Sequence, residues 1–349
     1  MSTSNPLAIC TFWFSLALLI TITGCGDVVL TREANVSGSA SARVTTAAAQ
    51  RALHGEVAPQ QSAPMRHICP AFGCVAPVFP VLTCNYQFTT VDFAGGAKNV
   101  VNGINSAGTV TGGFTVGSNT GPGHGFIEAN GVFTQFDFPG AAATAGAGID
   151  DIGDIVGAYA DPSGATRSYL LSNSEFMPVD FPDSTGTETW KINAAGQIVG
   201  GYFDAAGAEH GFVYYQGSFT SFDYPGATLT SGFDINNSGN IVGFYYDASG
   251  GEHGFLLTNM GQFSPIDVPG ANATVSECIN DAGQICGLYG TADGGVHGFV
   301  THGSTFVTVD APNSPDTRIR GINVHGQVVG RYNDTRGVIH GFVATPTCP

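Results

Sequence analysis

Short runs of β-branched and aromatic residues, separated by turn residues, fill the chain from Tyr86 onward. One stretch reads as four strands, at Gly217–Asp223, Thr230–Asn236, Asn240–Tyr246 and His253–Leu257. A Pro-Gly break and turns of the Asn-x-x-Gly and Asp-x-x-Gly types separate these strands, and glycine suits the positive φ that such turns need. This region has no helical periodicity. The pattern therefore predicts an all-β unit of four short strands.

The four-strand unit occurs six times. Three phrases recur in a fixed order: Phe-Asp-Phe-Pro-Gly, Ile-Asn-x-x-Gly-x-Ile-Val-Gly and His-Gly-Phe. Four-stranded units of about 40–50 residues in series, as here, are typical of β-propeller blades. The sequence therefore predicts a six-bladed β-propeller of antiparallel blades over residues 84–349. The first phrase supplies Asp92, Asp137, Asp180, Asp223, Asp267 and Asp310, and the third supplies His124, His210, His253, His297 and His340.

The phase of the repeat predicts how the ring closes. The longest link within a unit is the Pro-Gly segment, as at Tyr224–Leu229, and a propeller needs its longest link between an outer strand and the next inner strand. The strand that ends in Ile-Asn is therefore innermost. The repeats begin with an outermost strand, Tyr86–Asp92, and end with a third strand, His340–Ala344. The first strand is thus predicted to complete the last blade, which removes two open edges.

The recurring His and Asp are expected to pair. Each His opens a third strand and each Asp closes the adjacent outer strand, so the two ends lie close together. The second copy has Arg167 in place of His, and Arg also pairs with carboxylates. Although His and Asp together can transfer protons, six copies of one pair favour a structural role. The turns at Asp161, Asp204, Asp247 and Asp334 each offer too few oxygens for calcium and are read as hairpin turns.

The three phrases, over about residues 86–345, resemble the HAF family of probable extracellular repeats, which is named for a tripeptide of His, a small residue and Phe. Five copies here read His-Gly-Phe, with Gly where the family name has Ala. The resemblance implies an exported repeat domain. It implies no particular activity and carries over no catalytic residue.

Residues 1–25 are expected to be a lipoprotein-type signal peptide. Leu7 to Gly24 carries no charge, and Ile22-Thr23-Gly24-Cys25 resembles a bacterial lipobox, with cleavage before Cys25 and lipid on its thiol. No Lys or Arg precedes Leu7, so ordinary secretion and an uncleaved anchor helix stay as alternatives. Residues 26–83, rich in Ala, Ser, Thr and Pro, read as a flexible tether. The predicted location is the bacterial outer membrane or cell surface, and the alternative is a secreted or periplasmic protein.

Six cysteines follow Cys25, and an even number in an oxidising compartment suggests disulfides. Cys278 and Cys286 occur at their positions in one repeat only, on strands joined by a short turn, and are predicted to pair. Cys84 and Cys348 flank the two strands that close the ring and are also predicted to pair. Nothing in the spacing indicates a zinc site. The remaining pair would be Cys69–Cys74, and the rival pairing is Cys74–Cys84 with Cys69–Cys348.

The charge of the chain argues against two classes of partner. Eleven Lys and Arg against 27 Asp and Glu give a net charge of −16, which disfavours nucleic acid and anionic lipid as partners. Membrane contact is expected only through the lipid anchor, and the protein is expected to be a monomer. Neither a nucleophile motif nor a cofactor fingerprint is present in the sequence, so no cofactor and no metal are expected.

Residues that break the repeat are the best candidates for function, because the common fold does not require them. On the links into the inner strands these are Lys98, Trp190, Lys191, Glu277, Arg318 and Arg320. Trp190 with Arg318 and Arg320 would suit a sugar or a carboxylate through stacking and bidentate hydrogen bonds. The sequence therefore favours a non-enzymatic binding or envelope-interaction module with a glycan or protein ligand. A propeller-based hydrolase or lyase acting on glycans, and a purely structural envelope protein, are the alternatives.

Overall fold

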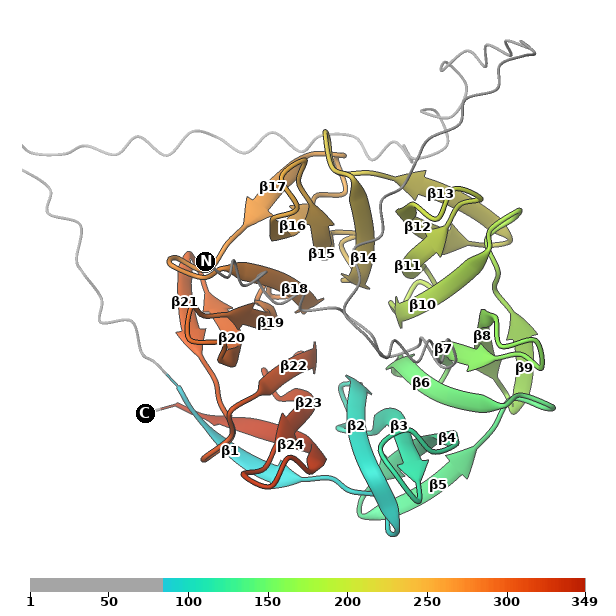
Figure 1. The fold of residues 1–349 in the computed structure, drawn as a ribbon, viewed down its shortest axis with the longest axis horizontal. Coiled ribbons are helices and arrows are strands. Elements are labelled where there is room, and N and C mark those ends of the chain that lie inside the picture. Colours follow the sequence, from blue (N-terminus) through green and yellow to red (C-terminus); the bar gives the residue numbers. More distant parts are fainter. Residues whose placement is uncertain (1–83, 349) are drawn as a thin grey trace, which may run out of the picture. The chain divides into compact units, whose positions relative to one another are not determined.

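Residues 84–348, the part of the chain that the computed structural model describes, form a six-bladed β-propeller (Figure 1). Each blade is a four-stranded antiparallel sheet, and the six sheets surround a common axis. The predicted fold class is thus confirmed. Within these residues no helix is long and apolar enough to span a membrane. The predicted signal peptide, the tether, Cys25 and the Cys69–Cys74 bond lie outside the described residues.

The strands of each blade follow one another from the axis outward, and only the last blade recruits a strand from the other end of the chain. The bounds, from inner to outer strand, are β2 (Gly96–Ile104), β3 (Val110–Val116), β4 (Gly123–Ala129) and β5 (Val132–Phe136) in blade 1; β6 (Ala143–Ile149), β7 (Ile155–Ala160), β8 (Thr166–Ser172) and β9 (Glu175–Pro178) in blade 2; β10 (Gly186–Ile192), β11 (Ile198–Phe203), β12 (Glu209–Tyr215) and β13 (Ser218–Phe222) in blade 3; β14 (Leu229–Ile235), β15 (Ile241–Tyr246), β16 (Glu252–Leu257) and β17 (Phe263–Ile266) in blade 4; β18 (Ala273–Ile279), β19 (Ile285–Gly290), β20 (Val296–His302) and β21 (Thr305–Thr308) in blade 5; and β22 (Thr317–Ile322), β23 (Val328–Asn333), β24 (Ile339–Thr347) and β1 (Asn85–Thr90) in blade 6.

The ring closes as the phase of the repeat predicts. Strand β1 pairs antiparallel with β24, in a register that runs from Asn85 opposite Thr347 to Thr90 opposite Phe342. A disulfide joins Cys84 to Cys348 just beyond this pair, with 4.2 Å between the two Cα atoms. The second predicted disulfide, Cys278–Cys286, bridges directly opposed residues of β18 and β19. Both bonds are confirmed.

The repeated phrases have identifiable structural work. The aromatic residue of the third phrase is fully buried in all six blades. The glycine of Ile-Val-Gly lets the inner strand approach, because a Cβ at Gly243 would overlap the carbonyl oxygen of Ser231 and crowd the Phe255 ring. These contacts allow few other side chains at the repeated positions. The buried aromatics are Phe126, Tyr169, Phe212, Phe255, Phe299 and Phe342.

The asparagine of the second phrase ties neighbouring blades together. In blade 4 the Asn236 Oδ1 accepts N–H groups from Ser238 and Asn240, which holds its turn, and its Nδ2 donates to the carbonyl of Asn280 in blade 5. Blade 2 has Asp150 at this position, whose carboxylate cannot make the donation. A nearly complete belt of hydrogen bonds therefore surrounds the axis, formed by Asn105 to Asp150, Asn193 to Asn236, Asn236 to Asn280, Asn280 to Asn323 and Asn323 to Asn105.

The five predicted His–Asp pairs are present, with Nδ1 to carboxylate distances of 2.7 to 3.0 Å. Arg167 differs from the expectation: its Nε lies 3.5 Å from the turn residue Asp161, whereas Asp180 accepts the Ser168 N–H. In blades 3, 4 and 6 the histidine also reaches the Asp of the turn, as His210 Nε2 does at 3.6 Å from Asp204, and Arg167 replaces this contact to the turn. The pairs are His124–Asp137, His210–Asp223, His253–Asp267, His297–Asp310 and His340–Asp92.

The four Asp-x-x-Gly segments are hairpin turns. In each turn the Asp Oδ1 accepts backbone N–H groups two and four residues later, as Asp247 does from Ser249 and Gly251. The carboxylate is therefore engaged with its own turn. Among the described residues, no group of three or more His, Cys, Asp and Glu is placed to hold a metal ion.

Candidate functional site

The six inner strands line the propeller axis and all begin and end at the same two levels. We call the end at which the Pro-Gly links enter the linker mouth, and the end with the Ile-Asn turns the Asn mouth. Side chains near the start of an inner strand lie toward the linker mouth, and those near its closing isoleucine lie toward the Asn mouth. This order places each candidate residue along the axis.

Every inner strand carries a β-bulge at one equivalent position. In blade 5, for example, the pairing of β18 with β19 skips the residue between Ser276 and Cys278. A bulged residue has no cross-strand partner, and a bulge redirects its side chain. All six skipped residues are 5% exposed or less. We call them the bulge ring: Asn102, Ala147, Trp190, Phe233, Glu277 and Arg320.

One arc of the bulge ring is apolar. The Trp190 ring meets the Phe233 ring edge to face, with 4.9 Å between centroids, and both pack in a cluster with Phe244 and Leu288. The sequence placed Trp190 and the other five candidates on the links between blades, which is wrong: all six lie within inner strands. Trp190 lies within β10 and is 5% exposed. The bulge turns this side chain into the core. Stacking of a ligand on Trp190 stays a prediction.

The other arc is charged. Glu277 and Arg320 come from adjacent blades, and Glu277 Oε2 lies 3.8 Å from Arg320 Nη1. Both side chains are at least 96% buried. Within the described residues, Arg320 Nε and Nη2 and Glu277 Oε1 have no hydrogen-bond partner. Unpaired buried polar atoms cost free energy, so these atoms need a partner, which a bound water or a ligand would supply.

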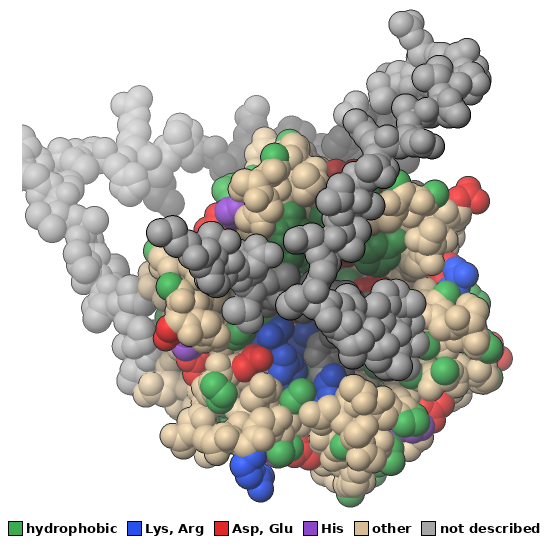
Figure 2. Space-filling view, viewed as in Figure 1, with side chains coloured by type: hydrophobic (Ala, Val, Ile, Leu, Met, Phe, Trp, Pro, Cys, Tyr) green, Lys and Arg blue, Asp and Glu red, His purple; other side chains and the backbone are tan. Residues whose placement is uncertain are grey.

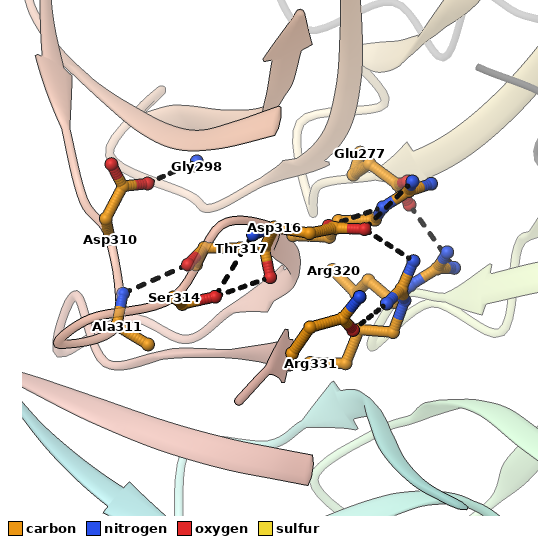
Figure 3. A network of polar contacts seen from close by, with 11 residues as sticks. Glu277, Gly298, Asp310, Ala311, Ser314, Asp316, Thr317, Arg320 and Arg331 are labelled. Carbon is orange, nitrogen blue, oxygen red and sulfur yellow. Dashed lines mark hydrogen bonds and ion pairs between the residues drawn. The ribbon is translucent and has the colours of Figure 1, made fainter. Parts of the chain in front are cut away.

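Next to this pair, two more arginines share one carboxylate (Figure 3). Asp316 accepts hydrogen bonds from Nε and Nη2 of Arg318, at 2.9 and 3.3 Å, and from Nη2 of Arg331 at 3.3 Å. Burial acts to raise the pKa of Asp316, but Arg331 and Arg318 hold it below its usual value. Arg331 also donates from Nη1 to Asn333, while its Nε has no partner in the described part of the chain.

Cations are concentrated at the axis. Five of the seven Lys and Arg in residues 84–348 lie on its inner or second strands, and only Arg167 and Arg336 do not. Burial, Arg331 and Arg320 together lower the pKa of Lys98 to about 7. Burial and Arg318 lower the pKa of Arg331 to about 9. Figure 2 shows basic side chains close to the middle of one face.

A second feature lies at the Asn mouth. A cavity of about 110 Å³ is lined by the closing isoleucines and the Asn or Asp residues of the inner turns, with Lys191 and Asp234 among its lining residues. Asp234 accepts the Ile279 N–H from the next blade, and burial raises its pKa to about 6. Burial lowers the pKa of Lys191, while Asp234 and Glu277 act to raise it.

Acids with raised pKa values cluster around blades 3 and 4; Glu209 and Glu252 are buried and Glu188 is half-buried. Burial and the proximity of Glu209 raise the pKa of Glu188 to about 8. Burial raises the pKa of Glu209 and of Glu252 to about 7. At neutral pH a large fraction of these carboxyl groups is protonated. They can then donate hydrogen bonds, which an ionised carboxylate cannot do.

The structure brings together most of the residues singled out from the sequence. Trp190, Glu277 and Arg320 share the bulge ring, Lys191 follows Trp190, and Arg318 lies closer to the linker mouth. Sequence reasoning missed Asp234, Asp316 and Arg331. A signal for Arg331 exists in the second strand, because the other five copies have Gly113, Ala158, Gly201, Phe244 and Leu288 at its position.

Neither a protein-family model nor a curated protein matches the chain. Solved structures resemble its fold. A mutant of AofleA from Arthrobotrys oligospora aligns with a TM-score of 0.50 and 11% identity, over 76% of this chain and 90% of that one. A protein of unknown function from Dyadobacter fermentans aligns with a TM-score of 0.49 and 10% identity, over 75% of this chain and 100% of that one. The Aleuria aurantia lectin aligns with a TM-score of 0.45 and 12% identity, over 75% of this chain and 96% of that one. It is described as a six-bladed β-propeller with a novel fucose recognition mode. At these identities the likeness concerns the fold alone.

Proposed function

We propose that this chain is an exported, non-enzymatic binding module of the HAF-repeat type, which holds a glycan or protein ligand at the propeller axis. The observation that carries the proposal is that, among the described residues, the Nε/Nη2 edge of buried Arg320 and the Oε1 of its ion-pair partner Glu277 have no hydrogen-bond partner. A propeller does not need buried charge at its axis, since blades 2 and 4 have Ala147 and Phe233 at the position of Glu277 and Arg320. Buried charges lower stability unless they are well paired, so their retention supports a role in binding.

The repeated residues and the axial residues have different roles. The His–Asp pairs, the Asn belt and the buried aromatics recur from blade to blade and account for folding. The bulge ring differs in every blade and is not needed for the common fold. This division supports a single composite site at the axis.

Export is supported by the lipobox-like segment and by the two disulfides of the propeller. We propose lipid attachment at Cys25 and a location at the bacterial outer membrane or cell surface. Metabolic labelling with a fatty-acid analogue tests it: the wild type should incorporate label and Cys25→Ser should not. Label retained in the mutant would show that Cys25 is not the anchor.

A glycan array probed with the purified protein tests the binding role. A hit without turnover supports a binding module, and loss of the same hit in Arg320→Met places it at the axis. Silence on the array, together with normal secretion and folding, would favour a structural or protein-directed role.

One observation favours an enzyme as the second candidate. Glu188 has a pKa raised to about 8, so it holds a proton at neutral pH, as the general acid of a glycosidase does. Turnover of an array hit that Glu188→Gln abolishes, with binding retained, would replace the binding module by a glycan hydrolase or lyase.

A further inference from the structure

We infer that Lys98, Arg318, Arg320 and Arg331 form a site for the oxyanion of an acidic sugar, in which Glu277 accepts a hydroxyl hydrogen bond from the same ligand. The inference rests on the proposed binding function and names the chemistry of its ligand. It is carried by the geometry of the arginine edges and by the charge balance at the axis.

The guanidinium edges show what is missing. A guanidinium holds a carboxylate best through Nε and one Nη, which donate two parallel hydrogen bonds. Arg318 uses this edge on Asp316, and Arg336 uses it on Asp334. In Arg320 both atoms of the same edge, Nε and Nη2, are buried and have no partner among the described residues. The vacancy has the shape of a carboxylate or of one edge of a phosphate.

The charge balance agrees with the geometry. The three arginines Arg318, Arg320 and Arg331 have two acids within ion-pair reach, Asp316 and Glu277. This leaves an excess of one positive charge among these five side chains, in a chain whose net charge is −16. Burial, and after it the charges of Arg331 and Arg320, lower the pKa of the neighbouring Lys98 to about 7. An oxyanion would supply the missing negative charge.

A sugar acid fits the site better than a bare anion. Glu277, whose Oε2 lies 3.8 Å from Arg320 Nη1, has a buried Oε1 with no donor in the described part of the chain. A carboxylate cannot satisfy it, whereas a hydroxyl group can donate to it. A ligand that carries both an acid and hydroxyl groups meets both needs at once. Lys98 and Arg318 lie nearer the starts of their strands, so the ligand would enter through the linker mouth.

Isothermal titration calorimetry with the exported protein tests the inference. The probes are tetragalacturonate, inorganic phosphate, an aspartate-rich peptide and neutral maltotetraose. We expect tetragalacturonate to bind and maltotetraose not to bind. Arg320→Met should weaken tetragalacturonate at least tenfold, and Arg320→Lys, which keeps the charge but loses the edge, should weaken it by a smaller factor. The matched control Arg336→Met alters an exposed arginine of the same blade and should leave affinity unchanged. Thermal unfolding of each variant verifies that it is folded.

The outcomes separate the two proposals. Binding of phosphate or the peptide but of no sugar would keep an anion site and refute the acidic sugar together with the glycan part of the proposed function. Maltotetraose bound as tightly as tetragalacturonate would refute the acid site while a glycan-binding role stands. Binding of no anion at millimolar concentration, or equal anion binding by wild type and both Arg320 variants, would overturn the inference.

Discussion

The Cys84–Cys348 bond should stabilise the propeller far more than the Cys278–Cys286 bond. The two bonds are chemically identical but close loops of very different length, with sequence separations of 264 and 8. In the chain-entropy model these lengths give about 5.6 and about 2.5 kcal/mol of unfolding free energy. The perturbations are the double variants Cys84→Ala/Cys348→Ala and Cys278→Ala/Cys286→Ala. Each removes one bond and leaves the other intact.

Denaturant unfolding of both variants against the wild type measures the difference. We expect the first variant to lose about 3 kcal/mol more than the second. Cys278 and Cys286 are fully buried, so their truncation also leaves a small void, and the measured difference will understate the effect of the loop. Amide hydrogen exchange adds a local readout, because β1 should lose protection in the first variant only. Equal destabilisation, or unchanged protection of Tyr86 to Thr90, would refute the view that this bond locks the closing strand.

Three further predictions follow from the hydrogen-bond belt, the His–Asp pairs and the buried acids. Asp150→Asn should complete the belt by donating to the carbonyl of Asn193, which would raise the unfolding free energy by about 0.5–1.5 kcal/mol in the same denaturant assay; Asp151→Asn is a nearby control. His253→Ala should cost no more than about 1 kcal/mol, because the pair is partly exposed, whereas Phe255→Ala should cost about 3–5 kcal/mol; similar losses would contradict the purely supporting role of the histidine. Glu209 and Glu252 have folded-state pKa values raised to about 7, so the folded protein binds their protons more tightly than the unfolded chain does. The stabilising contribution of these protons to the free energy of unfolding is complete below about pH 4.5 and is lost as the pH rises through about 7. The urea concentration at the unfolding midpoint should therefore decrease as the pH rises from 5 to 8. Glu252→Gln should make this decrease with pH smaller.

Much of the fold was predictable from the sequence because the propeller repeats itself. Six copies of each phrase reveal which positions are structural, and their phase determines the strand order and the closure by Tyr86–Asp92. Cys84 and Cys348 could be paired for the same reason, since the predicted closure brings their strands together. A local contact such as His253–Asp267 follows from the antiparallel order of adjacent strands.

The axis was less predictable because its residues meet across blades. Sequence comparison of the copies revealed Trp190, Glu277 and Arg320 as exceptions, but not the bulge that buries them. Arg331 was not predicted because it comes from β23, the second strand of its blade, and not from an inner strand. Asp234 was missed because a single acid beside the Ile-Asn phrase resembles ordinary variation. Only the register of the sheets places these residues together.

If the axis holds the ligand proposed above, the contacts of the bulge ring favour one binding site and not six. Neighbouring blades meet there in three different ways: Asn102 donates to the Gly146 carbonyl, Trp190 contacts Phe233, and Glu277 pairs with Arg320. Each contact joins a different pair of blades, so the ring retains no sixfold symmetry in its chemistry. The cations lie on blades 6 and 1 with Lys191 on blade 3, and the apolar contacts lie on blades 3 to 5. An acidic ligand at the axis would therefore meet the arginines of blade 6 on one side and the rings of Trp190 and Phe233 on the other, and its acid would face Arg320 in one orientation only.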